Sequence, residues 1–274
     1  MRILVKVGGS QLEEPRARAE LVRSVAKARA SGLEVVLVHG GGNQIRALVR
    51  RLGLREAYHE GLRITDAATA EVVQMVLAGL VGKSLAAAFE QQGVRAVSIS
   101  GADGSTFAPV PERRDGVDLG FVGAVGRVDP RLVETLLAAG YLPLVATVAP
   151  DPAAPTGTSG SFYNVNADTA AGPLARALAA EALLFLTDVR GVLDAEGHLI
   201  PSLSPDRCAA LRAEGVLSGG MIPKVEAALA ALARNPEALV KIAPAAGEDA
   251  VRAALDPAVG TRFTALEEAW TSTS

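Results

Sequence analysis

The chain has 274 residues, of which 49% are hydrophobic, and its mean hydropathy is +0.27, so it can form one large or two modest domains with a full core. The net charge of −3 argues against a nucleic-acid surface, which needs a basic excess. The single cysteine, Cys208, excludes an internal disulfide framework and suits a reducing cytoplasm. The uncharged stretch 135–150 is too short to span a bilayer, which takes about 20 residues, and no signal peptide is visible.

The first ten residues combine a buried strand with a glycine turn. Residues 3–7 are an apolar run that carries one lysine, Lys6, and the run stops at Gly8 and Gly9. A parallel strand covered on both faces is normally a continuous run of Val, Ile and Leu, and Lys6 departs from that rule. Beside two glycines, its ammonium can lie next to a polyanion held by backbone N–H groups. The alternative is an edge-strand lysine that limits aggregation.

Strand-like and helix-like segments alternate along most of the chain. Further strands are expected at residues 34–38, 94–100, 142–148, 183–187 and 239–243. Helices are expected at residues 15–30, 43–52, 66–92 with a break near 79–82, 130–139, 167–180 and 221–233. This alternation predicts right-handed crossovers and an α/β fold with a mostly parallel sheet.

Three segments depart from the alternation. Residues 107–128 are expected to form an antiparallel hairpin or flap. Residues 149–161 are rich in Pro, Gly, Thr and Ser and are expected to form a mobile loop. Residues 264–274 are expected to be a short frayed end.

A second glycine turn, Gly40-Gly41-Gly42, follows the strand at 34–38. Three glycines in a row lose much backbone entropy on ordering, so a site that has them usually needs a close backbone approach. Their N–H groups and the following helix start suit a carboxylate or a phosphate. A dinucleotide fingerprint is excluded because Ile45 stands where its third glycine would be. The alternative is a tight strand–helix turn.

Two further polar groups lie next to predicted helix starts. Arg63 is either an ordinary surface charge or a bidentate grip on a carboxylate. Asn164, Asn166 and Asp168 have the spacing i, i+2, i+4, so they share one side if that segment is extended. If a helix starts at Ala167 instead, Asn166 is its N-cap and Asp168 lies in the first turn.

The C-terminal half repeats the pairing of glycines with a cation. Gly219 and Gly220 precede the helix at 221–233, and Lys224 lies in its first turn, where it could grip a phosphate. Thr187 and Asp188 leave a strand at its carboxyl end, where open α/β sheets bind ligands. Together these motifs predict an anion site built from several strand ends and helix starts.

With these motifs the chain resembles the amino acid kinase family, and within it the branch that acts on N-acetyl-L-glutamate. The motifs follow the order of the family and span nearly the whole chain. They are Lys6-Val7-Gly8-Gly9-Ser10, His39-Gly40-Gly41-Gly42, Gly61-Leu62-Arg63-Ile64-Thr65, Leu119-Gly120-Phe121-Val122-Gly123, Tyr163-Asn164-Val165-Asn166-Ala167-Asp168, Thr187-Asp188-Val189 with Gly191-Val192, and Gly219-Gly220-Met221-Ile222-Pro223-Lys224.

The resemblance implies a three-layer α/β/α sandwich with two lobes. Residues 1–168 would bind the acyl-amino acid and dimerise, and residues 169–274 would bind ATP. The implied reaction is the ATP-dependent phosphorylation of the side-chain carboxylate of N-acetyl-L-glutamate to N-acetyl-L-glutamyl 5-phosphate, in arginine biosynthesis. Lys6 and Lys224 would neutralise charge on the transferring phosphoryl group, and Asp168 would orient both lysines.

The resemblance also implies binding roles for two sets of residues. The residues that would hold N-acetylglutamate are Gly41, Gly42, Arg63, Asn164 and Asn166. The residues that would line the nucleotide site are Gly8, Gly9, Thr187, Asp188, Val192, Gly219 and Met221.

The implied chemistry is consistent with the residue types. The side-chain carboxylate of the acceptor has a reference pKa of about 4.3, so it is ionised near neutral pH and no histidine has to act as a base. What remains is repulsion between two anions, which the lysines and Mg²⁺ relieve by positioning and charge neutralisation. Because the sequence has no dense carboxylate cluster, we expect no protein-held metal, and Mg²⁺ would be carried mainly by the ATP phosphates.

The oligomeric state and the competing functions follow from the same resemblance. Family members inhibited by arginine carry an extra N-terminal helix that builds hexamers, whereas this chain begins at its first strand, so we expect an arginine-insensitive homodimer. One alternative function is a kinase for carrier-protein-linked 2-aminoadipate in lysine biosynthesis. Another is a catalytically silent sensor of nucleotides or amino acids, although retention of Lys6, Lys224 and Asp168 argues against it. The failed dinucleotide fingerprint disfavours hydride transfer.

Overall fold

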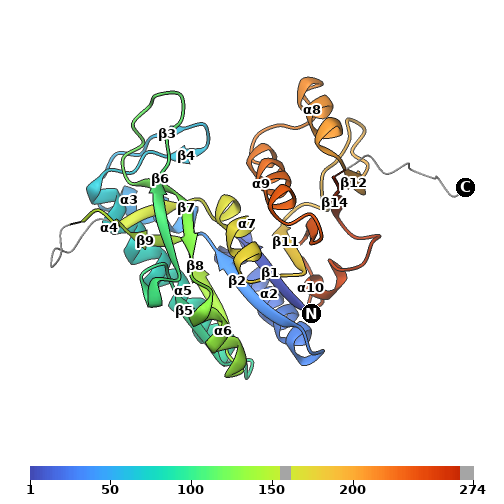
Figure 1. The fold of residues 1–274 in the computed structure, drawn as a ribbon, viewed down its shortest axis with the longest axis horizontal. Helices are drawn as coiled ribbons and strands as arrows, with labels where there is room; N and C mark the ends of the chain where they lie inside the picture. Colours follow the sequence, from blue (N-terminus) through green and yellow to red (C-terminus); the bar gives the residue numbers. More distant parts are fainter. Residues whose placement is uncertain (155–161, 266–274) are drawn as a thin grey trace, which may run out of the picture.

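An eight-stranded sheet forms the centre of the computed structural model, which describes residues 1–154 and 162–265 (Figure 1). The strand order is β12-β14-β13-β11-β1-β2-β8-β5, and every neighbouring pair is parallel except β13–β14. The sheet is therefore mostly parallel, as predicted. Its strands are β1 (Arg2–Val7), β2 (Glu34–His39), β5 (Ala96–Ile99), β8 (Leu142–Ala146), β11 (Ala182–Thr187), β12 (Ser202–Leu203), β13 (Leu239–Pro244) and β14 (Thr261–Phe263).

Helices cover both faces of this sheet and complete the predicted three layers. One hydrophobic cluster packs α2 (Pro15–Ala30), α3 (Gly42–Arg51), the long helix 67–90 and α10 (Ala250–Ala253) against the sheet. The other packs α6 (Arg131–Ala138), α7 (Ala167–Ala177), α8 (Pro205–Ala213) and α9 (Met221–Arg234) against the opposite face. This burial on both faces explains why β1 is almost continuously apolar.

The position of Lys6 on β1 follows from strand periodicity. Ile3 and Val5 belong to the first cluster, whereas Leu4 belongs to the second. Since side chains alternate along a strand, Lys6 lies on the same face as Leu4 and is directed toward the layer that contains α7 and α9. Immediately after β1, Gly8 and Gly9 lead into a short helix, α1 (Ser10–Glu13).

A second sheet, which the sequence reveals only in part, stands beside the main one. Its hairpin, β6 (Phe107–Pro111) with β7 (Val122–Val128), is antiparallel, as predicted. The hairpin is extended by β10 (Phe162–Val165) and β9 (Val148–Pro150) into a four-stranded sheet. The prediction of one strand over residues 142–148 is therefore wrong, because the chain leaves the main sheet after β8 and joins the second sheet as β9. A further pair, β3 (Tyr58–His59) and β4 (Leu62–Arg63), was not predicted.

The long helix continues through the predicted break near residues 79–82, so that prediction is wrong. It consists of α4 (Ala67–Gln74), a π-helical segment η1 (Met75–Val81) and α5 (Gly82–Glu90). The helix changes to wider π turns over this segment and then continues as an α-helix, so Gly79 and Gly82 do not end it. Gly82 has a packing role instead, because a Cβ at that position would lie 2.1 Å from Ser98 Oγ on β5.

By length and composition, helix 67–90 could cross a membrane. However, 44% of its most apolar stretch is buried in this structure. Its buried side chains, including Val73, Leu77 and Leu85, belong to the cluster that covers one face of the main sheet. A core helix of this kind passes the same test without being a membrane span.

The fold does not test three predictions in full: the division into two lobes, the mobile loop and the frayed C-terminal end. Four strands of the main sheet come from residues 1–168 and four from residues 169–274, joined at the β1–β11 pair, and the division into lobes stays a prediction. The predicted mobile loop begins within β9, and its residues 155–161 lie outside the described part of the chain. Residues 266–274 of the predicted frayed end also lie outside it.

Candidate active site

Two lysines from opposite ends of the chain meet on one buried carboxylate. Lys6 lies near the carboxyl end of β1, Asp168 in the first turn of α7 and Lys224 in the first turn of α9. Lys6 Nζ is 2.7 Å from Asp168 Oδ1, and Lys224 Nζ is 3.3 Å from Asp168 Oδ2. Lys6 and Asp168 are 5% and 9% exposed, so water screens this cluster poorly. The structure thus brings together the three residues predicted to be catalytic.

The cluster holds an excess of positive charge. Burial would raise the pKa of Asp168, but Lys6 and Lys224 outweigh it and hold that pKa below its ordinary value. Burial lowers the pKa of Lys6, an effect that Asp168 opposes and the neighbouring Lys224 reinforces. Two ammonium groups share a single carboxylate, so an anion that arrives here relieves the repulsion between them.

A hollow of about 270 Å³ opens beside Lys6, and every residue predicted to bind the acceptor lines it. Its lining includes Gly41, Gly42, Arg63, Asn164 and Asn166. Gly41 is closely packed, because a Cβ at this position would lie 2.8 Å from Leu77 Cδ2 and 3.1 Å from Val81 Cγ2, and these side-chain ends would have to shift. Side chains of the π-helical segment η1 therefore lie directly against the glycine turn.

The polar side chains of this first hollow have distinct partners. Arg63 is only 7% exposed, and its Nη2 donates to Gly42 O at 3.2 Å. Asn164 Nδ2 donates to Thr65 Oγ1 at 3.3 Å. Asn166 is the N-cap of α7, since its Oδ1 accepts from the backbone N–H of Asp168 at 2.8 Å. The helix start at Ala167 is thus confirmed, and the cap fixes the backbone that carries Asp168.

A second hollow of about 110 Å³ adjoins the first. It is lined by Thr187, Asp188 and Lys224, and by Lys6, Gly8 and Gly9, which also line the first hollow. Gly9 has a φ of 57°, a left-handed conformation that favours glycine. Because three residues belong to both hollows, the two spaces adjoin each other beside Lys6, Gly8 and Gly9.

Three residues predicted to bind the nucleotide do not line the second hollow. Val192 is buried, and its backbone N–H donates to Thr261 Oγ1. Met221 is partly buried and packs against the core that contains α9. Gly219 lines a different groove. The resemblance implied that these residues line the nucleotide site, but they do not line the small second hollow.

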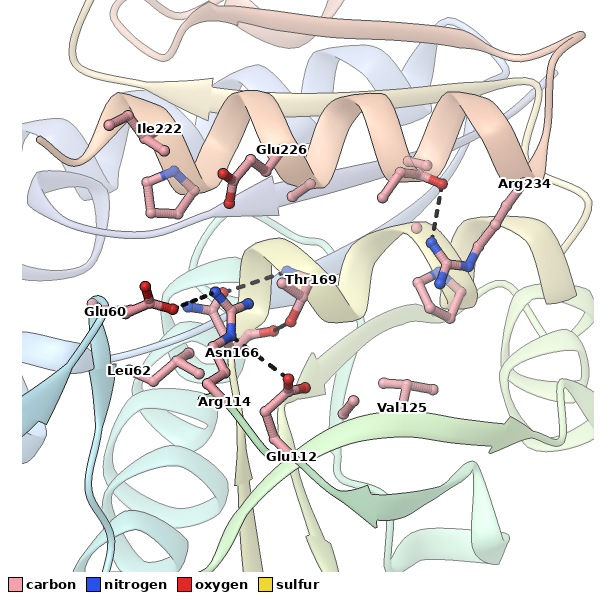
Figure 2. A pocket seen from close by; sticks show the side chains of 18 of the residues that line it. Glu60, Leu62, Glu112, Arg114, Val125, Asn166, Thr169, Ile222, Glu226 and Arg234 are labelled. Carbon is pink, nitrogen blue, oxygen red and sulfur yellow. Dashed lines mark hydrogen bonds and ion pairs between the residues drawn. The ribbon is translucent and has the colours of Figure 1, made fainter. Parts of the chain in front are cut away.

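That groove, of about 600 Å³, runs between α9 and the β6–β7 hairpin, with α7 along its length (Figure 2). Asn166 and Gly219 belong to its lining, but Lys6, Asp168 and Lys224 do not. Figure 2 shows Arg114 lying between Glu60 and Glu112, with which it forms ion pairs of 3.6 Å each. The groove adjoins the first hollow, with which it shares Gly61, Leu62 and Asn166, but none of the three residues predicted to be catalytic lines it.

Several residues around the two hollows were not predicted from the sequence. Arg46 and Tyr58 line the first hollow, and Ser10 and Gln11 line the second. Glu56 Oε1 accepts a hydrogen bond from Arg63 Nη1. The two-residue strands β3 and β4 are too short to show an alternating pattern, so the sequence gives no sign that Tyr58 pairs with Arg63.

The described residues that line the two hollows include no histidine. His39 lies nearby but is fully buried, and burial lowers its pKa to about 4. Its Nδ1 is 3.0 Å from Gly40 O, so this nitrogen carries the proton and donates to the carbonyl. His39 is therefore a neutral part of the glycine turn near pH 7.

Comparison with known proteins identifies the family of the chain. The model of the amino acid kinase family matches residues 1–241. The acetylglutamate kinase of Acidiphilium cryptum is 46% identical over 240 residues, which cover 84% of this chain and 78% of that protein. The acetylglutamate kinase of Erythrobacter litoralis is 41% identical over 247 residues, covering 86% and 81%.

Solved structures show the same fold. A Streptococcus mutans protein has a TM-score of 0.79 and 27% identity, covering 96% of this chain and 98% of its own. The N-acetylglutamate synthase of Neisseria gonorrhoeae, complexed with coenzyme A and N-acetyl-glutamate, has a TM-score of 0.81 and 23% identity, with 98% of this chain and 60% of that chain covered. With its fold, its motifs and these relatives in agreement, the chain belongs to the amino acid kinase family.

Proposed function

We propose that the chain is a kinase that transfers the γ-phosphoryl group of ATP to the side-chain carboxylate of N-acetyl-L-glutamate. The product would be N-acetyl-L-glutamyl 5-phosphate, in arginine biosynthesis. The observation that carries the proposal is the junction of the two hollows, where Lys6 and Lys224 share the carboxylate of Asp168. The acetylglutamate kinases that match most of the chain support the choice of acceptor.

The first hollow is the proposed acceptor site. Two of the five N–H groups of Arg63 are directed to protein oxygens, which leaves others to bind the carboxylate that does not react. Backbone N–H groups of Gly41 and Gly42, at the start of α3, favour an anion at the same place. Asn164 and Asn166 also line this hollow.

The second hollow is the proposed site of the ATP phosphates, next to Gly8, Gly9, Thr187 and Asp188. A carboxylate oxygen of the acceptor attacks the γ-phosphorus, a new P–O bond forms, and the bond to the β,γ-bridging oxygen breaks to release ADP. No proton moves, because the acceptor is already ionised. Lys6 and Lys224 stabilise charge on the phosphoryl oxygens from two sides, and Asp168 orients both ammonium groups.

The outlying nucleotide residues remain part of the proposal. Val192, Gly219 and Met221 would contact parts of the nucleotide that extend beyond the small second hollow. Bound ADP, located by crystallography, would test each contact directly.

Mg²⁺ fits this site as a companion of ATP rather than as a resident ion. The described residues that line the two hollows include two carboxylates, and one of them, Asp168, is already paired with both lysines. Mg²⁺ keeps several waters and is held by few carboxylates together with substrate phosphates, where it would neutralise phosphate charge. Within the described ranges, His59, Glu60 and Asp115 could also hold a metal, but they lie outside both hollows.

The deciding experiment measures ADP release with three acceptors: N-acetyl-L-glutamate, free L-glutamate and carrier-bound 2-aminoadipate. We expect turnover with the first alone, because acylation removes the α-ammonium charge that free glutamate would bring close to Arg63, next to its α-carboxylate. Turnover with the carrier-bound acceptor would support the lysine-biosynthesis alternative. Binding of ATP without turnover of any acceptor would identify a sensor.

We also propose that the protein is a cytoplasmic homodimer. Met75 and Leu80 are 54% and 58% exposed on the long helix. They lie five residues apart within the π-helical segment, so they share one side of it. A second copy of the chain would cover this apolar side. Sedimentation should show a dimer, and Leu80→Asp should shift it toward monomer.

A further inference from the structure

A cluster of charged and aromatic residues lies behind Arg63, outside the set that the sequence motifs assign to the site. We propose that Glu56 and Tyr58 are positioning residues that fix the guanidinium of Arg63, so that the first hollow selects acceptors carrying a second carboxylate. This inference rests on the proposed function, because it concerns the acceptor of that reaction. It assigns the discrimination between acceptors to two residues that do not themselves react.

Glu56 is the centre of the cluster. Its Oε1 accepts from Tyr58 OH at 2.5 Å, from Arg46 Nε at 3.0 Å and from Arg63 Nη1 at 3.2 Å. Its Oε2 is 3.4 Å from Arg50 Nε. The Glu56 side chain is 15% exposed, so these partners largely replace water around the carboxylate. A single carboxylate therefore links α3 to the hairpin that carries Arg63.

Tyr58 acts on Arg63 through its ring as well as through its hydroxyl group. The two residues are paired across the β3–β4 hairpin, and Arg63 Cζ lies 4.8 Å from the centre of the Tyr58 ring. A guanidinium over an aromatic face is attracted by the π electrons, most strongly where water is scarce. With Gly42 O accepting from Nη2, the group is held by a ring face, a carboxylate and a carbonyl.

The charge of the cluster is suited to an anionic ligand. The hydrogen bond from Tyr58, together with those from Arg46 and Arg63, lowers the pKa of Glu56 to about 2, so the carboxylate is ionised. Arg46 and Arg63 both line the hollow and share this one negative charge. A positive excess thus remains here, in addition to that of Lys6 and Lys224. One hollow with two positive groups is complementary to a dicarboxylate.

A purely structural role would give a different pattern of effects. If Glu56 only tied the hairpin to α3, its loss would weaken every ligand of the hollow alike. A positioning role toward Arg63 predicts a loss confined to ligands that bear the carboxylate which Arg63 binds. The comparison ligand is 4-acetamidobutanoate, which is N-acetylglutamate without its α-carboxylate and retains the reacting group.

The experiment compares Glu56→Gln and Tyr58→Phe with wild type by calorimetric binding of both ligands and by steady-state kinetics. Glu60→Gln is the matched control, since Glu60 lies on the same hairpin segment but pairs with Arg114 instead. For Glu56→Gln we expect a Kd and KM for N-acetylglutamate about tenfold higher, which corresponds to one misaligned charged hydrogen bond. Binding of 4-acetamidobutanoate, kcat and KM for ATP should stay within about twofold of wild type.

Tyr58→Phe keeps the ring and removes the hydroxyl group, so a smaller loss, again confined to N-acetylglutamate, is expected. Equal weakening of both ligands in Glu56→Gln, or no weakening of either, would overturn the inference. So would a wild-type protein that binds the two ligands equally well. If wild type binds N-acetylglutamate but releases no ADP, the proposed function fails, while the binding comparison still decides the role of Glu56.

Discussion

Acidification from pH 7 to pH 5 should destabilise the protein through His39. This side chain is fully buried at the end of β2, and burial lowers its pKa from 6.5 to about 4. The unfolded chain therefore binds a proton below pH 6.5 that the folded chain does not bind until the pH is near 4. Stability that is fully present at pH 7 is lost as the pH falls through this window.

The size of the effect follows from the two pKa values. At pH 5 the unfolded imidazole is about 97% protonated and the folded one about 9%, so the linkage free energy is about 2 kcal/mol. At pH 7 the same quantity is only about 0.2 kcal/mol. Below pH 4 the effect of His39 levels off at about 3 kcal/mol, which is a large part of the stability of an ordinary domain.

Urea unfolding of wild type and His39→Asn at pH 7 and pH 5 would measure this effect. Asparagine keeps an N–H donor for Gly40 O but cannot titrate, and all other groups act equally in both proteins. We expect wild type to lose about 2 kcal/mol more than the variant between the two pH values. Equal losses in the two proteins would refute the reasoning. An NMR titration of wild type, in which His39 should stay neutral at pH 5, checks the assignment independently.

Other predictions concern the charged centre and the acceptor site. Lys6→Ala and Lys224→Ala should each lower kcat about a hundredfold with little change in KM, because the ammonium charge matters most during transfer; losses confined to KM in steady-state assays would contradict this. Arg63→Ala should raise the KM for N-acetylglutamate at least about tenfold and leave that for ATP unchanged, and the opposite pattern would reassign the hollow. Asp168→Asn should lower the free energy of unfolding by about 3 kcal/mol at pH 7, measured in urea, because it leaves the buried Lys6 without its counter-ion.

Local sequence patterns predicted six of the eight strands of the main sheet and missed the short strands β12 and β14. The strands β1, β2, β11 and β13 were predicted within one or two residues, because helices cover both faces and leave nearly continuous apolar runs. Glycines that follow these strands marked the turns at Gly8 and Gly41. Since parallel strands end at one edge of the sheet, the turns also indicated where ligands should bind.

Predictions failed where a choice depended on distant partners. Residues 142–148 have one apolar run, yet the chain divides it between two sheets because β9 finds β10 as a partner. Gly79 and Gly82 resemble a helix break, but packing of Gly82 against Ser98 favours a continuous helix. Neither outcome leaves a periodic signal in the local sequence.

The sequence by itself determined the α/β fold and which residue types stand at the strand ends. The resemblance implied that Asp168 orients Lys6 and Lys224, and the tertiary structure places all three in contact. Only the tertiary structure revealed that Glu56 and Tyr58 contact Arg63. The physical reason is the separation along the chain between the residues that interact. Periodicity reports which face of an element is buried, whereas a charge cluster depends on how separate elements pack, and that information lies in no single segment.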